Sequence, residues 1–209
     1  MSEELKTRVL RKVRDIFGEA AYADYEPALA AFIEDVRAVG GKAHLVGREN
    51  LESNIEAQIV DSALMLKAFE RTGEERRTVA DIGPGAGFPG IIWKVLKPEL
   101  EITLIERKSK MAAFLSREAA RLKLKDLYIY AGDAAEAEFK PFQAVVSKAA
   151  GKLTEILPVA EKLLESGGIY ITIKGPDWEM DGEPHRVREM RMEKEELIGR
   201  GKIIIFRKF

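Results

Sequence analysis

Apolar side chains recur at helical spacing in three stretches before the first strand pattern, at residues 3–17, 26–39 and 51–69. Positions three or four apart share one face of a helix, so this spacing predicts three amphipathic helices. We expect residues 1–72 to form an N-terminal helical extension packed on a larger core. Such an extension either helps to shape a substrate mouth or shields a sheet edge.

From Val79 onward, short apolar strand patterns alternate with helical ones. The expected strands cover residues 77–82, 101–106, 126–130, 142–147 and 168–174, and the expected helices cover residues 88–97, 109–123 and 152–165. This alternation implies right-handed crossovers and a parallel sheet. Two last strands, 195–198 and 202–207, predict a hairpin that closes the sheet edge. Residues 73–209 therefore form an expected α/β, Rossmann-like domain with a mainly parallel sheet and an antiparallel last strand.

The most distinctive stretch is the run Gly83-Pro-Gly-Ala-Gly-Phe-Pro-Gly90, which directly follows the first strand. Its glycines permit sharp turns and close approach of a ligand, and the following helix offers unpaired N–H groups. This pattern indicates a nucleotide-binding loop. A dinucleotide loop requires G-x-G-x-x-G, but Phe88 stands at the third glycine position, so the spacing fits dinucleotides poorly.

Asp81 precedes this loop by two residues and adds an electrostatic argument. A carboxylate there repels a pyrophosphate but suits a cationic, amine-bearing ligand, which favours S-adenosylmethionine. The strand count and the antiparallel finish are also those of class I S-adenosylmethionine-dependent methyltransferases. The residues expected to bind this cofactor around the loop are Asp81, Gly83, Pro84, Gly85, Ala86, Gly87 and Phe88.

Further candidates follow the other strands, because ligands of open α/β sheets bind beyond the carboxyl ends of the strands. Glu106 ends the second strand, where its carboxylate can accept both ribose hydroxyls, and Arg107 comes next. Asp133, or its neighbours Ala134 and Ala135, would contact the adenine. The pair Gly132-Asp133 equally fits a helix N-cap.

Composition excludes several kinds of chemistry. The 209 residues are 46% hydrophobic, which suffices for one α/β domain with a short appendage. The absence of cysteine and the presence of only two histidines exclude disulfides, cysteine-type zinc sites and thiol nucleophiles, and we expect no metal.

No apolar run approaches the ~20 residues that span a bilayer. We therefore expect a soluble, cytoplasmic protein without membrane contact, and a monomer.

A formal net charge of −1 gives no strong overall field for nucleic acid, so an RNA site must be a local patch. Each candidate patch could equally be a solvated surface. The candidates are Lys6, Arg8, Arg11, Lys12 and Arg14; then Arg117, Arg121, Lys123 and Lys125; and finally Arg186, Arg188 and Arg191.

Taken together, these motifs resemble the small-subunit ribosomal RNA guanine-N7 methyltransferases, also called the glucose-inhibited division protein B family. The most specific match is the loop 83–90, which ends in the family's unusual Phe-Pro-Gly. Further matches are the segments 59–62, 106–115, 146–149 and 173–175. The resemblance implies a ribosomal RNA or small-subunit substrate.

The chain departs from the family pattern at five positions. His44 and Val46 stand in place of its Asn and Thr, Gln58 in place of a histidine, Asp133 where it often has arginine, and Lys148 in place of an arginine. A lysine keeps the charge of an arginine but loses its planar fork. These departures leave the cofactor assignment intact and bear on the exact substrate.

By this resemblance, the reaction is displacement of a methyl group from a sulfonium by guanine N7. Because N7 carries no proton, no general base is needed, and positioning and electrostatics should provide the catalysis. Lys148 is expected to contact the cofactor carboxylate or the target base, and Lys174 the base or a phosphate. Both lysines could instead be surface residues with extended stems.

The N7 edge is hidden in the deep groove of an RNA helix, so an unpaired or extruded guanine is the expected target.

Two other functions fit the sequence. One is a methyltransferase for a small molecule or a protein side chain. The other is a diverged module that binds cofactor and ribosome without catalysis.

Overall fold

The computed structural model describes residues 2–19, 22–40, 50–73, 75–175, 189–198 and 201–209. His44, Val46, Arg186 and Arg188 lie outside these residues. The elements are α1 (Ser2–Phe17), α2 (Tyr22–Gly40), α3 (Leu51–Glu70), β1 (Thr78–Ile82), α4 (Gly90–Leu96), β2 (Glu101–Ile105), α5 (Ser109–Arg121), β3 (Leu127–Tyr130), β4 (Phe142–Lys148), α6 (Leu153–Leu163), β5 (Leu164–Lys174), β6 (Met190–Ile198) and β7 (Gly201–Lys208).

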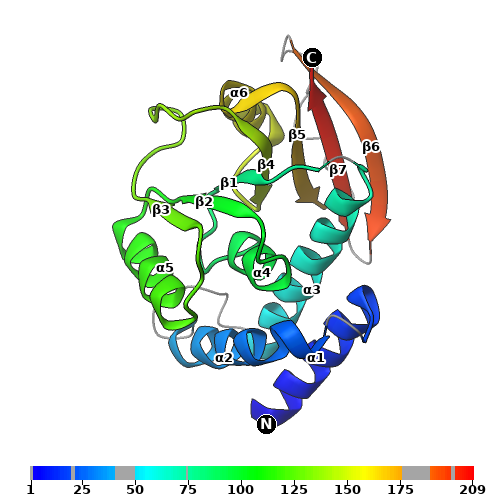
Figure 1. Cartoon of the computed structure of the whole chain (residues 1–209), viewed down its shortest axis with the longest axis vertical. Helices are drawn as coiled ribbons and strands as arrows, with labels where there is room; N and C mark the ends of the chain where they lie inside the picture. Colours follow the sequence, from blue (N-terminus) through cyan, green and yellow to red (C-terminus); the bar gives the residue numbers. More distant parts are fainter. Residues whose placement is uncertain (1, 20–21, 41–49, 74, 176–188, 199–200) are drawn as a thin grey trace.

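The strands form one sheet in the order β3-β2-β1-β4-β5-β7-β6 (Figure 1). The first five pair in parallel, and β7 is antiparallel to both of its neighbours. The expected mainly parallel sheet with an antiparallel finish is therefore confirmed. The closing hairpin begins earlier than expected, since its first strand starts at Met190 rather than Glu195.

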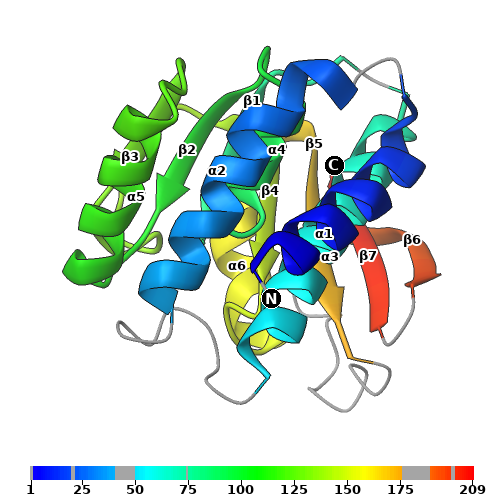
Figure 2. The same ribbon diagram turned by 90° about the horizontal axis from the view of Figure 1, so that it is seen from below.

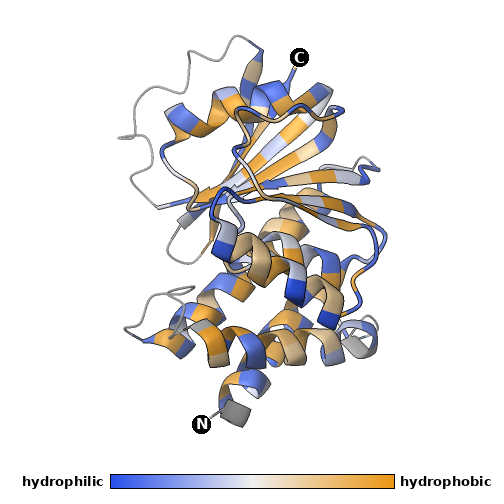
Figure 3. Cartoon of the chain, turned by 90° about the vertical axis from the view of Figure 1, so that its left-hand side faces the viewer, coloured by the Kyte–Doolittle hydropathy of each residue, from blue (hydrophilic) through white to orange (hydrophobic). Residues whose placement is uncertain are grey.

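Alternation along the strands gives the sheet two buried faces. Val79, Leu104 and Ile171 pack with the helices α1 to α5, whereas Ala80 and Ile105 pack with α6 on the opposite face. The central strands of the sheet are accordingly largely apolar (Figure 3). A parallel sheet covered on both sides by helices is the arrangement that its crossovers require.

The N-terminal helices share the core of the sheet. Trp93 of α4 donates its indole N–H to the Ser62 carbonyl of α3 at 2.9 Å, and its ring lies 5.1 Å from that of Phe69. Figure 2 looks onto α1 and α2, which form the outer layer on this side. The residues of α1 to α3 belong to the same buried cluster as one face of the sheet. The division of the chain after residue 72 stays a prediction.

None of the helices in the described part of the chain combines the length and the apolar character that a membrane-crossing segment requires.

Candidate active site

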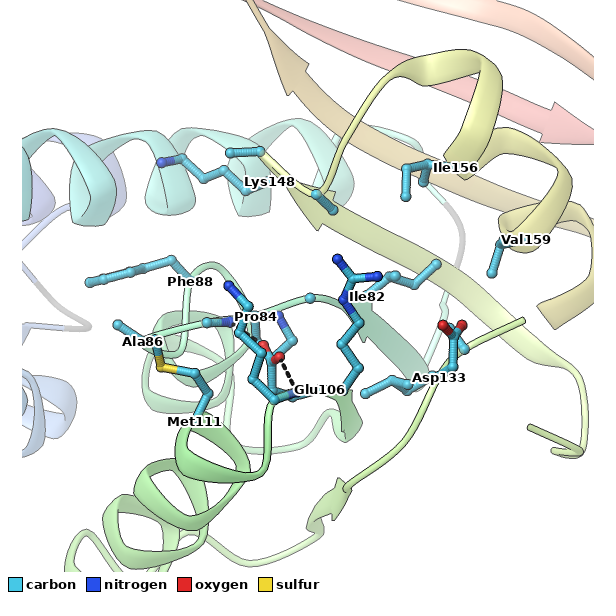
Figure 4. Close-up of a pocket in the computed structure, with 18 of the residues that line it drawn as sticks. Ile82, Pro84, Ala86, Phe88, Glu106, Met111, Asp133, Lys148, Ile156 and Val159 are labelled. Carbon is cyan, nitrogen blue, oxygen red and sulfur yellow. Dashed lines mark hydrogen bonds between the residues drawn. The ribbon is translucent and has the colours of Figure 1, made fainter. Parts of the chain in front are cut away.

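A pocket of about 800 Å³ opens beyond the carboxyl ends of the parallel strands (Figure 4). Loops after β1, β2, β3 and β4 line it, together with sides of α3 and α6. The structure brings most of the predicted site residues into this one pocket: Gly83, Pro84, Gly85, Ala86, Phe88, Glu106, Arg107, Asp133, Ala134 and Lys148. Asp81, Gly87, Ala135 and Lys174 do not line it.

The glycine loop has the backbone conformation that its sequence predicts. Gly83, Gly85 and Gly87 have φ values of 68°, 57° and 101°, in the region that side chains disfavour. At Gly87 a Cβ atom would also lie 2.6 Å from Cδ1 of Ile91. At Gly83 and Gly85 the loop presents bare backbone to the pocket, between the side chains of Pro84, Ala86 and Phe88.

Glu106 connects two of the loops that line the pocket. Its Oε2 accepts a hydrogen bond from the Gly85 N–H at 3.0 Å, and its Oε1 accepts one from the Lys108 N–H at 2.8 Å. The residue is only 5% exposed, and each carboxylate oxygen retains a further lone pair. Glu106 is thus fixed in orientation and still able to accept from a ligand.

Asp81 lies beneath the glycine loop and is fully buried. Its Oδ2 accepts a hydrogen bond from the Gly90 N–H at 2.7 Å, at the start of α4. Within the described residues its Oδ1 has no partner. Burial, with a smaller contribution from the Glu106 charge, raises the pKa of Asp81 to about 8.

At neutral pH the Asp81 carboxyl is therefore mostly protonated. The charge argument made from the sequence requires an ionised carboxylate, whereas burial favours the neutral form of Asp81. The side chain instead anchors the loop to the first turn of α4.

One end of the pocket combines a carboxylate with apolar walls. Asp133 lies at this end with Ile82, Ile156 and Val159 (Figure 4). Asp133 Oδ1 also accepts a hydrogen bond from the Ala135 N–H at 2.9 Å, but residues 134–136 form a turn and no helix, so the alternative of a helix N-cap is wrong. This end offers a flat apolar space beside a hydrogen-bond acceptor.

The opposite end is formed where β4 meets α3. Lys148, the last residue of β4, donates a hydrogen bond from its ammonium to Oε1 of Gln58 and lies 3.5 Å from Oδ2 of Asp61. Its side chain is 6% exposed. Burial lowers the pKa of Lys148, and Asp61 opposes part of this shift. Asn54, one turn before Gln58, lines the same wall.

Lys174 lies away from the pocket lining. Its ammonium donates a hydrogen bond to the carbonyl of Gly151, in the loop between β4 and α6. Ala149 and Ala150 of the same loop line the pocket, and Ala149 has a φ of 56°. Lys174 thus holds a strained loop that forms the pocket wall. The contact of Lys174 with a base or a phosphate stays a prediction.

The sequence named Gln58 only as a departure from the family pattern, and it did not assign Asn54 or any residue of α6 to the site. Asn54 and Gln58 come from α3, and Glu155, Ile156 and Val159 come from α6. The spacing of Asn54 and Gln58, four residues apart on an amphipathic helix, was a usable signal that both share a face. Only the tertiary packing shows that this face meets the strand ends.

The basic patch expected on α1 is largely neutralised by ion pairs. Arg8 and Lys12 both contact Glu56 of α3 at 2.6 Å, and Lys6 contacts Glu34 of α2 at 3.4 Å. On α5, Arg121 contacts Asp35 and Glu118 in the same way. These cations join helices to each other. Arg107 and Lys108, by contrast, line the pocket and are exposed.

Solved structures with the same fold support the class. MtNAS in complex with MTA and tNA matches with a TM-score of 0.62 and 13% identity, over 89% of this chain and 70% of that one. The precorrin-6y C5,15-methyltransferase from Geobacter metallireducens GS-15 matches with a TM-score of 0.50 and 17% identity, over 70% and 87%. With the strand order and the pocket position, these matches define a class I methyltransferase fold.

The model of the rRNA small subunit methyltransferase G family matches residues 25–198, so the chain belongs to this family. The resemblance seen in the sequence motifs is thereby confirmed.

Two relatives named "Ribosomal RNA small subunit methyltransferase G" illustrate the similarity. That of Mycoplasma capricolum is 36% identical over 65% of this chain, and that of Rhodospirillum centenum is 37% identical over 70%. The chain spans 58% and 66% of the lengths of these two relatives.

Proposed function

We propose that this protein transfers a methyl group from S-adenosylmethionine to N7 of a guanine in small-subunit ribosomal RNA. The observation that carries the proposal is that a single pocket joins the glycine loop and Glu106 at its centre to a lysine-bearing wall at one end. Family membership supplies the class of substrate. Ribosomal RNA, alone or in the assembled small subunit, is the proposed partner.

The residues present fit the cofactor. Gly85 lines the pocket with open space where a Cβ atom would stand, so a ligand can approach the loop backbone closely there. Glu106 is oriented by two backbone N–H groups and can accept from ribose hydroxyls. Asp133 and Ala134, with the apolar side chains of α6, provide the space for an adenine.

The groups that would hold the adenine and the groups that would surround the methyl group lie at opposite ends of the pocket. Phe88 and Lys148 lie at the opposite end of the pocket from Asp133 (Figure 4), so with the adenine beside Asp133 these two residues would face the sulfonium end. S-adenosylmethionine supplies an electrophilic methyl group on a sulfonium. The target base would enter between the loop that carries Lys148 and the side of α3.

The described side chains at this end suit a reaction that transfers no proton. Guanine N7 attacks with a lone pair and carries no hydrogen, so no general base has to be positioned there. Lys148, Gln58 and the strained loop at Ala149 would hold the base in line with the methyl group. Lys174 would act as a positioning residue through Gly151.

The test is incubation with labelled S-adenosylmethionine and small ribosomal subunits that lack the methyl group. Mass spectrometry of RNA fragments then locates any label. A single methylated guanine is the expected result. Binding of the cofactor without transfer to these subunits would contradict the proposal and favour another substrate or a non-catalytic module.

A further inference from the structure

Gln58 and Lys148 form a pair of polar groups at the end of the pocket where the target base would lie. Lys148 ends β4 and Gln58 lies on α3, so the two come from opposite sides of the pocket entrance. The ammonium donates to Oε1 of Gln58. Because an ammonium only donates, this contact fixes the amide orientation, with Oε1 toward Lys148 and the amide nitrogen directed elsewhere.

The amide nitrogen of Gln58 has no acceptor among the residues that the structure describes. Gln58 is half-buried and lines the pocket, so its two N–H groups are available to a ligand there. The ammonium of Lys148 has three donors, and the described residues provide two partners for them, Gln58 and Asp61. Gln58 and Lys148 therefore present donors to a base, whereas Asp61, which does not line the pocket, faces the Lys148 ammonium.

A guanine presents two adjacent acceptors, N7 and O6, on the edge that must face the methyl group, whereas adenine presents N7 and the N6 amino donor. With N7 directed at the methyl group, O6 would meet the free donors of Gln58 and Lys148. An adenine in the same position would direct its N6 amino donor at the N–H donors of Gln58 and Lys148. Unpaired polar groups of this kind cost enough to discriminate between bases.

The Asp61 carboxylate reduces the effect of the positive charge of Lys148 on the reaction. Methylation moves positive charge onto the purine, and an isolated ammonium nearby would oppose that transfer. The Asp61 carboxylate, 3.5 Å from the Lys148 ammonium, offsets its charge and leaves its hydrogen-bonding capacity in place.

We propose that Gln58 and Lys148, held together beside Asp61, recognise O6 of the target base and make the enzyme specific for guanine over adenine. This inference rests on the proposed function and adds the specificity-determining residue on α3. The N-terminal helical extension then supplies half of the base-recognition site, in addition to its packing role.

The test compares wild type with Gln58→Glu on two substrates, subunits with the mapped guanine and subunits with adenine at that nucleotide. Glutamate keeps the size and the acceptor for Lys148 but loses both N–H donors. We expect guanine transfer to fall roughly 10- to 100-fold, and the guanine-to-adenine ratio to fall with it, at unchanged cofactor Kd.

Gln143→Glu is the matched control, because Oε1 of Gln143 accepts from the N–H groups of Arg77 and Thr78, away from the pocket. It should leave both rates unchanged. Gln58→His retains one acceptor and one N–H donor and should restore part of the guanine preference.

An unchanged ratio in Gln58→Glu, including an equal loss on both substrates, would overturn the inference. Wild-type protein that methylates no guanine would instead remove the proposed function, and the inference with it.

Discussion

The two ends of the pocket are built in different ways. At the cofactor end, backbone N–H groups from the loops after β1 and β2 meet one carboxylate, in the bonds from Gly85 and Lys108 to Glu106. At the substrate end, side chains 90 residues apart meet, as Lys148 meets Gln58. The first end is built from loops that follow two adjacent paired strands, whereas the second depends on how the helical extension packs on the sheet.

The largest expected effect is a loss of cofactor affinity on substitution of Glu106. Glu106→Ala removes the acceptor for two loop N–H groups as well as the proposed ribose contact, so cofactor affinity should fall by about 100-fold or more. Calorimetric titration with S-adenosylmethionine measures it. Glu101→Ala, at the exposed start of β2, is the control. An unchanged Kd in Glu106→Ala would refute the ribose assignment.

Gly90→Ala tests how rigid the backbone at this end is. A Cβ atom there would lie 2.3 Å from Cδ2 of Leu104 and 2.7 Å from Oδ2 of Asp81, inside a packed core. We expect a loss of roughly 2–3 kcal/mol in the free energy of unfolding, measured with urea. Gly175→Ala has no atom within 4 Å to meet and should cost far less. Equal stabilities would show that the core at α4 adapts.

Asp81→Asn tests the buried carboxyl under the loop. The raised pKa means that the folded protein keeps a proton that the unfolded chain loses above its ordinary value of 3.8. Wild-type stability should therefore fall as the pH rises from about 4 to about 8 and then level off. Asparagine removes this dependence and should stabilise the protein by on the order of 2 kcal/mol at pH 7. Parallel pH profiles of the two unfolding free energies would contradict the assignment.

The smallest expected effect concerns the substrate end. Lys174→Met keeps the stem but removes the donor to Gly151, so the loop at Ala149 should lose its fixed position. We expect kcat to fall about 3- to 10-fold while the cofactor Kd stays constant, measured by methyl transfer to small subunits. A loss confined to cofactor affinity would place Lys174 at the other end of the pocket.

The sequence predicted the architecture well, because buried parallel strands show continuous apolar runs and the crossovers follow from their order. It shortened β6, since that strand lies at the sheet edge with most of its residues exposed and charged, which hides a strand pattern. The glycine loop and Glu106 were recognisable because their roles depend on neighbours in the chain.

The rest of the site required the tertiary structure. The ionisation of Asp81 depends on its complete burial. The contact of Lys148 with α3 and the distance of Lys174 from the pocket are set by long-range packing. The departures at Gln58 and Lys148, read separately from the sequence, become a single contact in the fold.

The most direct test of this separation is binding of labelled S-adenosylmethionine by equilibrium dialysis to wild type, Glu106→Ala and Gln58→Glu, with methyl transfer measured on the same preparations. The account predicts that Glu106→Ala loses cofactor binding, whereas Gln58→Glu binds cofactor normally and loses its preference for guanine. Equal loss of cofactor binding in both variants would contradict the division of the pocket into two independent ends.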